Sequence, residues 1–377
     1  MTEARPRRKL VLAILVVATL VGFLAVFAVW AKRQALETDS WVETSSELLE
    51  DQDIQEAVAG FLVDALFTNV DVEAELQARL PPQFQSLAGP AAGALRELAD
   101  RAALEALSRP RIQQLWQDAN RVAHETFVDV VENDTEEDVN LDLNAILEDL
   151  GSRVGIDIAD RLPPDAGQIE VLRTDQLSAV QQAVRTFRTV GYVVAFGALL
   201  LFALAIYLAE GWRREALRAT GFCFILIGIA VLAVRGFAGD LLVDSLAETA
   251  ASEPAVNSTW SIGTELLKGI AVGMIGYGVV AVLGAWLAGP GEWARAARRT
   301  LTPVLRDRVI GYAVLFVIVL LVFWWAPTQG TQRLIPSLVL IALMIAGFEA
   351  LRAQALRDFP DETFETLQQR WRNRRAA

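Results

Sequence analysis

Residues 10–30 read LVLAILVVATLVGFLAVFAVW, and this stretch decides how the rest of the chain is arranged. It contains 21 residues and no charge. Because an α-helix rises about 1.5 Å per residue, a helix of this length crosses the roughly 30 Å hydrocarbon core of a bilayer. Four basic residues lie within residues 5–9, and basic flanks stay on the cytoplasmic side. The sequence therefore predicts a membrane anchor that follows a cytoplasmic amino terminus, residues 1–9.

A cleaved signal peptide is the alternative interpretation of this stretch. The apolar core of a signal peptide has about 7–15 residues, and the present one is longer. Val29-Trp30-Ala31 is also a poor cleavage site. We expect an uncleaved anchor; cleavage would leave five later spans in the same orientation.

The composition indicates membrane spans combined with a soluble part. Of the 377 residues, 53% are hydrophobic, and the net charge is −12. That charge is unevenly distributed, because residues 31–189 carry a net −18 and the remainder a net +6. A block this acidic excludes nucleic acid as its partner. The single cysteine, Cys223, lies in a predicted span, so no disulfide framework is expected.

Helical periodicity dominates residues 31–189. Ser40 and Glu43 have the spacing of a capping box, in which each side chain satisfies a backbone donor near the other. Leu80-Pro81-Pro82 ends one helical run, and Ser108 and Pro110 begin another. The first run has one predicted apolar face, made of Ile54, Val58, Phe61, Leu62, Ala65 and Leu66.

The second half of this block is less regular. Residues 132–138 form an acidic run, and residues 145–154 have the pattern of a helix. Residues 139–143 and 169–171 alternate with period two, which is the pattern of two short strands that pair as a ribbon. The expected fold of residues 31–189 is thus mainly α.

Five further apolar segments follow the acidic block. A polar helical pattern from Thr174 runs into the first of them without a breaker, which predicts one long helix from the domain into the membrane. Gly269, Gly273, Gly276, Gly278 and Gly284 predict close helix packing in the fourth span of the chain, or a flexible gate. The five segments are 190–208, 219–237, 267–287, 309–326 and 334–351.

Arginine and lysine separate cleanly between alternate connections. Eighteen basic residues fall in the amino terminus, the loops 211–218 and 289–308, and the tail. The loop 238–265 has no basic residue, and the loop after the fifth span has only Arg333. Basic residues accumulate on the cytoplasmic side of short loops. The sequence therefore predicts an all-α, six-span plasma-membrane protein with both termini cytoplasmic. Its parts are a cytoplasmic segment 1–9, a span 10–30, an acidic helical extracytoplasmic domain 31–189, a five-helix bundle 190–351 and a basic cytoplasmic tail 352–377.

Three short patterns resemble a known family. They are Thr38-Asp-Ser-Trp-Val-Glu-Thr44, Trp116 followed by Asn120-Arg-x-Ala-His124, and Asn140-Leu-Asp-Leu143. The chain is similar, mostly over residues 1–190, to a family of actinobacterial integral membrane proteins of unassigned activity. That resemblance implies an anchor, a helical extracytoplasmic domain and further spans, and it transfers no catalytic residue.

The candidate binding residues are few. Charges inside a bilayer are costly and are commonly functional. Arg235 and Lys268 lie near the outer ends of spans, where they either reach the interface or bind anionic headgroups, with Asp240, Asp244 and Glu265 as alternative partners. The middle of each span lacks charge, which argues against an ion-coupled transporter.

The acidic block offers Trp116, Asn120 and His124, spaced about one helical turn apart. A general base needs an oriented partner and a nucleophile or water. The sequence shows no such set around His124, so a structural hydrogen bond is its favoured role. No cysteine–histidine cluster has zinc spacing, and residues 132–138 lack the EF-hand spacing. We expect no cofactor and no metal.

The functional hypothesis from the sequence is a non-enzymatic protein of the bacterial cell envelope that acts as a scaffold or sensor. Its expected partners are the lipid bilayer, anionic headgroups at the basic loops and tail, and an envelope protein or a second copy of the chain. The alternative is a transporter or channel for lipid or ion, with the extracytoplasmic domain as a cap. A continuous cavity lined by Arg235, Lys268 and Tyr277 would favour that alternative.

Overall fold

The computed structural model describes residues 4–132, 140–142, 168–170, 174–247, 252–325 and 334–363, with positions 366 and 372. The chain divides into two compact units. Unit 1 comprises Met1–Phe27, Tyr192–Val234 and Leu266–Ala377, and unit 2 comprises Ala28–Gly191 and Arg235–Glu265. The divisions therefore fall within helices rather than in linkers.

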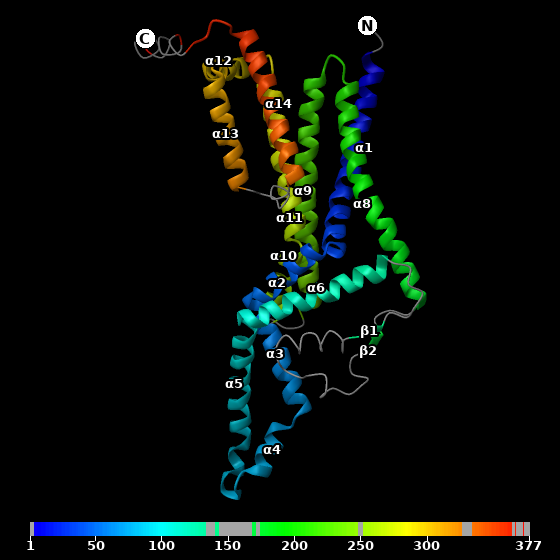
Figure 1. Cartoon of the computed structure of the whole chain (residues 1–377), viewed down its shortest axis with the longest axis vertical. Coiled ribbons are helices and arrows are strands. Elements are labelled where there is room, and N and C mark those ends of the chain that lie inside the picture. Colours follow the sequence, from blue (N-terminus) through cyan, green and yellow to red (C-terminus); the bar gives the residue numbers. More distant parts are fainter. Residues whose placement is uncertain are drawn as a thin grey trace. The chain divides into compact units, whose positions relative to one another are not determined.

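The helices that contribute to unit 1 are mostly long (Figure 1), and their sequences are mostly apolar, which is typical of membrane spans. The exception is α12, which has one charged and one apolar face. They are α1 (Ala4–Leu36), α8 (Thr174–Leu208), α9 (Arg213–Leu246), α11 (Glu265–Leu287), α12 (Glu292–Arg306), α13 (Arg308–Trp325) and α14 (Leu334–Asp358).

Four helical segments within the described residues are long and apolar enough to cross a membrane: Arg7–Leu36, Gly191–Leu208, Arg213–Leu246 and Glu265–Leu287. A fifth results only if α12 and α13, which are bent by 110° relative to each other, form one span. The count of six is therefore not reached in the described part of the chain. Helix α14 includes the sixth predicted span, but several of its side chains lie outside the described residues.

Helix α8 confirms the prediction of one continuous helix from Thr174 into the second span. Helix α9 is longer than expected, because it continues past residue 237 to Leu246. Between them, Gly211 has a φ of 81°. That left-handed conformation is readily adopted by glycine and allows the tight turn between the two helices.

Helices α9 and α11 pack with their backbones in close approach. A Cβ atom built at Gly278 would lie 2.6 Å from the carbonyl oxygen of Gly221, and one at Gly228 would lie 2.5 Å from that of Ala271. The contact positions increase along α9, from 221 to 228, as they decrease along α11, from 278 to 271. The two helices are therefore antiparallel. Only part of the predicted glycine packing is seen, because Cβ atoms at Gly276 and Gly284 would meet nothing within 4 Å.

Unit 2 is a set of shorter helices joined to the ends of α1, α8 and α9. Helix α2 packs on α6, α3 packs on α5, and α10 packs on both α2 and α3 (Figure 1). The elements are α2 (Thr38–Glu50), α3 (Gln52–Asn69), α4 (Val72–Arg79), the 3-10 helix η1 (Pro82–Leu87), α5 (Ala88–Leu107), α6 (Pro110–Glu132) and α10 (Glu253–Gly263).

The helix starts in unit 2 differ from the predicted capping box. Helix α2 begins at Thr38, so Ser40 lies inside the helix and is buried, and the predicted cap is wrong. The side chains of Asp51 and Asp71 instead accept hydrogen bonds from the backbone N–H groups of Ile54 and Ala74, at 3.2 and 2.9 Å. These aspartates cap α3 and α4, because the first N–H groups of a helix have no partner within it.

Two three-residue strands, β1 (Asn140–Asp142) and β2 (Gln168–Glu170), pair antiparallel with Leu141 opposite Ile169. They overlap the segments that alternate with period two. The predicted helix 145–154, most of the acidic run 132–138 and most of the basic tail after residue 363 lie outside the described residues.

Candidate functional site

His124, the single histidine, lies in a small aromatic cluster between α2 and α6. Its ring stacks on Trp41 with centroids 5.3 Å apart and an interplanar angle of 22°. Phe127 contacts the same ring at 6.2 Å. His124 is only 5% exposed.

Both ring nitrogens of His124 make hydrogen bonds. Nε2 lies 3.3 Å from the carbonyl oxygen of Ala35, and Nδ1 lies 3.1 Å from Oγ1 of Thr38. A carbonyl only accepts, so Nε2 carries the proton and Nδ1 of the neutral ring accepts from the Thr38 hydroxyl. The Ala35 carbonyl is in the last turn of α1, where carbonyls lack a helical partner. His124 thus joins the end of α1 and the start of α2 to α6.

Burial lowers the pKa of His124 below its usual value, and this effect outweighs the hydrogen bond to Ala35 and the nearby charge of Glu125, which raise it. The ring is therefore neutral near pH 7. A neutral imidazole with both nitrogens engaged has no lone pair directed at a substrate. This geometry favours the structural role.

Trp116 and Asn120 do not join this cluster through hydrogen bonds. The indole N–H of Trp116 donates to the carbonyl of Ser45 at 2.7 Å, which ties α6 to α2. The amide of Asn120 donates to the carbonyl of Trp116 within its own helix. Trp116 and His124 therefore tie α6 to other elements at separate points, whereas the amide of Asn120 bonds only within α6.

Arg235 binds the carboxyl-terminal end of α10. Its Nε donates to Oγ1 of Thr264 at 2.8 Å, and its Nη2 donates to the carbonyl of Ser261 at 3.2 Å. The indole of Trp260 in turn donates to the Arg235 carbonyl at 3.2 Å. Arg235 thus stabilises unit 2, whereas Lys268 belongs to unit 1. No local sequence pattern predicts this role, because the partners are 26 to 29 positions away.

Exposed apolar side chains lie on α3, η1 and α5. Helix α3 buries Gln55, Ala59 and Val63, whereas Phe61 is 72% exposed. The apolar face predicted from the sequence is therefore not the buried face of α3. The buried residues of α3 are instead Gln55, Ala59 and Val63. We call the exposed residues the hairpin face: Phe61, Leu62, Leu66, Phe84, Leu87, Leu95 and Leu98.

Four arginines gather around α12 and α14. Arg298 is 2% exposed; its Nη1 donates to the carbonyls of Leu287 and Gly289, and its Nη2 donates to Oδ2 of Asp358 at 2.7 Å. The neighbouring contacts are Arg299 to Glu362 at 2.6 Å, Arg306 to the Pro360 carbonyl at 2.8 Å, and Arg352 to the Leu305 carbonyl at 2.8 Å. These arginines are structural, although the charge pattern presents three of them as loop residues.

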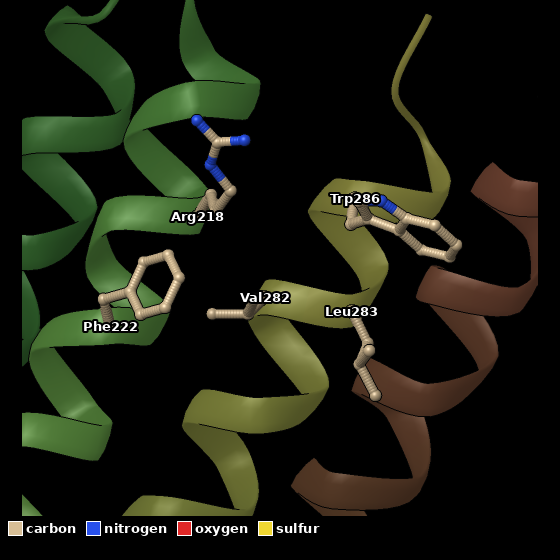
Figure 2. Close-up of a pocket in the computed structure, with 5 residues that line it drawn as sticks. All are labelled: Arg218, Phe222, Val282, Leu283 and Trp286. Carbon is tan, nitrogen blue, oxygen red and sulfur yellow. The ribbon is translucent and has the colours of Figure 1, made fainter. Parts of the chain in front are cut away.

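A cavity of about 500 Å³ lies between α9 and α11. Figure 2 shows the Phe222 ring and Val282 facing each other across it, with the Arg218 guanidinium on the α9 side and Trp286 on the α11 side. Leu283 completes the lining. None of the residues that would favour a transporter lines this cavity.

The comparisons add no relative. No protein-family model, no curated protein and no solved structure matches the chain. Within the described residues, no group of three or more histidine, cysteine, aspartate or glutamate side chains is placed to hold a metal ion. The functional argument therefore depends on the geometry above.

Proposed function

We propose that this chain is a multi-pass protein of the bacterial cell envelope that works by binding a partner through its extracytoplasmic domain. In this proposal it has six spans and cytoplasmic termini, and it belongs with the actinobacterial membrane proteins that it resembles. Residues 31–189 are extracytoplasmic, and the basic inner loops and tail lie on anionic lipid. The role of His124 supports a non-enzymatic function.

Contacts between loops support this orientation. Arg7 pairs with Glu210 at 3.4 Å and Arg8 pairs with Glu215 at 3.6 Å, so the amino terminus meets the turn after α8 and the first turn of α9. Helix α12 meets the end of α14 through its arginines. Positive-inside sorting assigns all of these segments to the cytoplasm.

A second contact joins segments that the charge pattern assigns to the outside. Helix α10 packs on α2 and α3 within unit 2, and the Ser258 hydroxyl donates to Oδ2 of Asp53 at 3.3 Å. Residues 31–189 and 238–265 are both assigned to the outside by the same sorting. Each contact thus joins segments that the charge pattern places on one side.

The observation that carries the binding role is the hairpin face. Contiguous exposed apolar residues outside a membrane span mark sites of interaction between proteins, because they leave apolar area in water. Phe61, Leu62 and Leu66 are exposed on α3, and Leu95 and Leu98 are exposed on α5, which packs on α3.

The binding role is tested by photo-crosslinking in native membranes. A photoreactive residue replaces Phe61 in one sample and the exposed Glu56 of α3 in the other. We expect a discrete adduct, with an envelope protein or a second copy, from position 61 alone, and its loss with Leu66→Ser. Equal adducts from both positions, or none from position 61, would contradict the proposal.

The orientation is tested separately by cysteine labelling. In a Cys223→Ser background, Gln77→Cys should react with a membrane-impermeant maleimide on intact cells. Arg295→Cys should react only after permeabilisation. The reverse pattern would show that the layout is inverted.

A further inference from the structure

The cavity between α9 and α11 lies at one end of an antiparallel helix pair. Helix α9 begins at Arg213 and α11 ends at Leu287, and the contact between Gly221 and Gly278 brings these ends together. Arg218 is therefore about 8 Å along α9, and Trp286 is the next-to-last residue of α11. Tryptophan and arginine at the ends of spans meet the headgroup region of a bilayer.

Arg218 has no hydrogen-bond or ion-pair partner among the residues that the structure describes. Two nearby arginines are engaged: Arg8 pairs with Glu215, and Arg213 donates to the Tyr207 carbonyl at 3.4 Å. An uncompensated guanidinium near the hydrocarbon boundary is costly, and its planar N–H groups match the oxygens of a phosphate. The chemistry at this end of the cavity thus favours an anion.

The rest of the cavity is apolar. Phe222 is 54% exposed, and Leu283 and Trp286 are also exposed. The volume of about 500 Å³ falls within the roughly 300–1,000 Å³ typical of ligand pockets. A soluble anion would leave these walls uncovered, whereas a hydrocarbon chain would cover them.

We propose that this cavity binds one anionic glycerophospholipid, with the phosphate at Arg218 and an acyl chain against Phe222 and Leu283 (Figure 2). Charge complementarity selects the headgroup, and the apolar walls select a lipid over free phosphate. This proposal rests on α9 and α11 crossing the bilayer, which the proposed function shares. It does not depend on the hairpin face.

The test is native mass spectrometry of the full-length protein in detergent, titrated with phosphatidylglycerol, phosphatidylcholine or inorganic phosphate. We expect one retained phosphatidylglycerol in the wild type. Arg218→Gln should weaken its binding about tenfold or more, because hydrogen bonds between charged groups contribute at least that factor. Arg295→Gln is the matched control, because Arg295 is exposed on α12, has no partner among the described residues and does not line the cavity.

A second variant tests the apolar part of the site. Leu283→Trp keeps Arg218 and fills the cavity, so it should also release the lipid while the protein stays folded, as Leu283 is exposed. Equal weakening by the Arg218 and Arg295 variants would overturn the proposal. Binding of phosphatidylcholine as tight as that of phosphatidylglycerol, or displacement by inorganic phosphate, would also overturn it. If the lipid-binding test fails while the crosslinking and cysteine-labelling experiments give their expected results, the proposed function still stands.

Discussion

Replacing Gly278 by alanine should destabilise the packing of α9 on α11, whereas the same change at Gly276 should not. At Gly278 the added Cβ would lie 2.6 Å from the Gly221 carbonyl oxygen and 2.9 Å from the Ile225 nitrogen. Ordinary contact begins at 3.4 Å, so the helices must separate by about 0.8 Å. Both groups are backbone atoms and cannot rotate away, so we expect an overpacking cost of about 1–3 kcal/mol.

Gly276→Ala serves as the control, because a Cβ at that position would meet nothing within 4 Å. Alanine is favoured over glycine in a helix by about 0.8–1.0 kcal/mol, and this gain applies at both positions. The difference between the two variants therefore reports the clash alone.

The assay is thermal unfolding of the purified protein in detergent, followed by intrinsic tryptophan fluorescence. Gly278→Ala should unfold several degrees below the wild type, and Gly276→Ala should unfold at or above it. Equal unfolding temperatures for the two variants would refute the close approach of these helices.

Three further predictions concern ionisable side chains. Folding lowers the pKa of His124, so the unfolded chain binds this proton more tightly and stability should fall as the pH drops below about 6.5. Thermal unfolding from pH 8 to 5 measures this fall, which should be smaller with His124→Gln. Partial burial, followed by the charges of Glu43, Glu265 and Glu50, raises the pKa of Glu47. Glu47→Gln should therefore raise the unfolding temperature at pH 7, and this increase should disappear towards pH 4.5. Arg298→Met leaves the carbonyls of Leu287 and Gly289 without their donor and removes the ion pair with the partly exposed Asp358, so it should cost about 1–3 kcal/mol in thermal unfolding, whereas Arg295→Met should not change stability.

Much of the helical layout could be predicted because it depends on local patterns. Apolar length predicted the helices that contain the first four spans, and the unbroken pattern from Thr174 predicted α8. A span must satisfy its backbone hydrogen bonds within itself, so its signal is contained in the span. Helix caps were predicted less well, since several polar residues near Ser40 were equally suitable.

The candidate site could not be predicted in the same way. Trp116, Asn120 and His124 share one helix, and the sequence favoured a structural hydrogen bond for His124 without identifying its partners. Their partners, the carbonyls of Ser45, Trp116 and Ala35, are backbone groups, which any residue supplies. The sequence could therefore favour a structural role for the histidine but could not identify the backbone carbonyls that these side chains meet.

The sequence by itself determined where apolar helices form and how positive charge sorts between their connections, because both properties belong to the residues of one segment. The tertiary structure decided that α10 packs on α2 and α3, that Arg298 is buried between α12 and α14, and that Phe61 faces outward. These outcomes depend on which distant helix covers a given face. Periodicity shows that a face is apolar, and only packing shows whether the chain itself covers it.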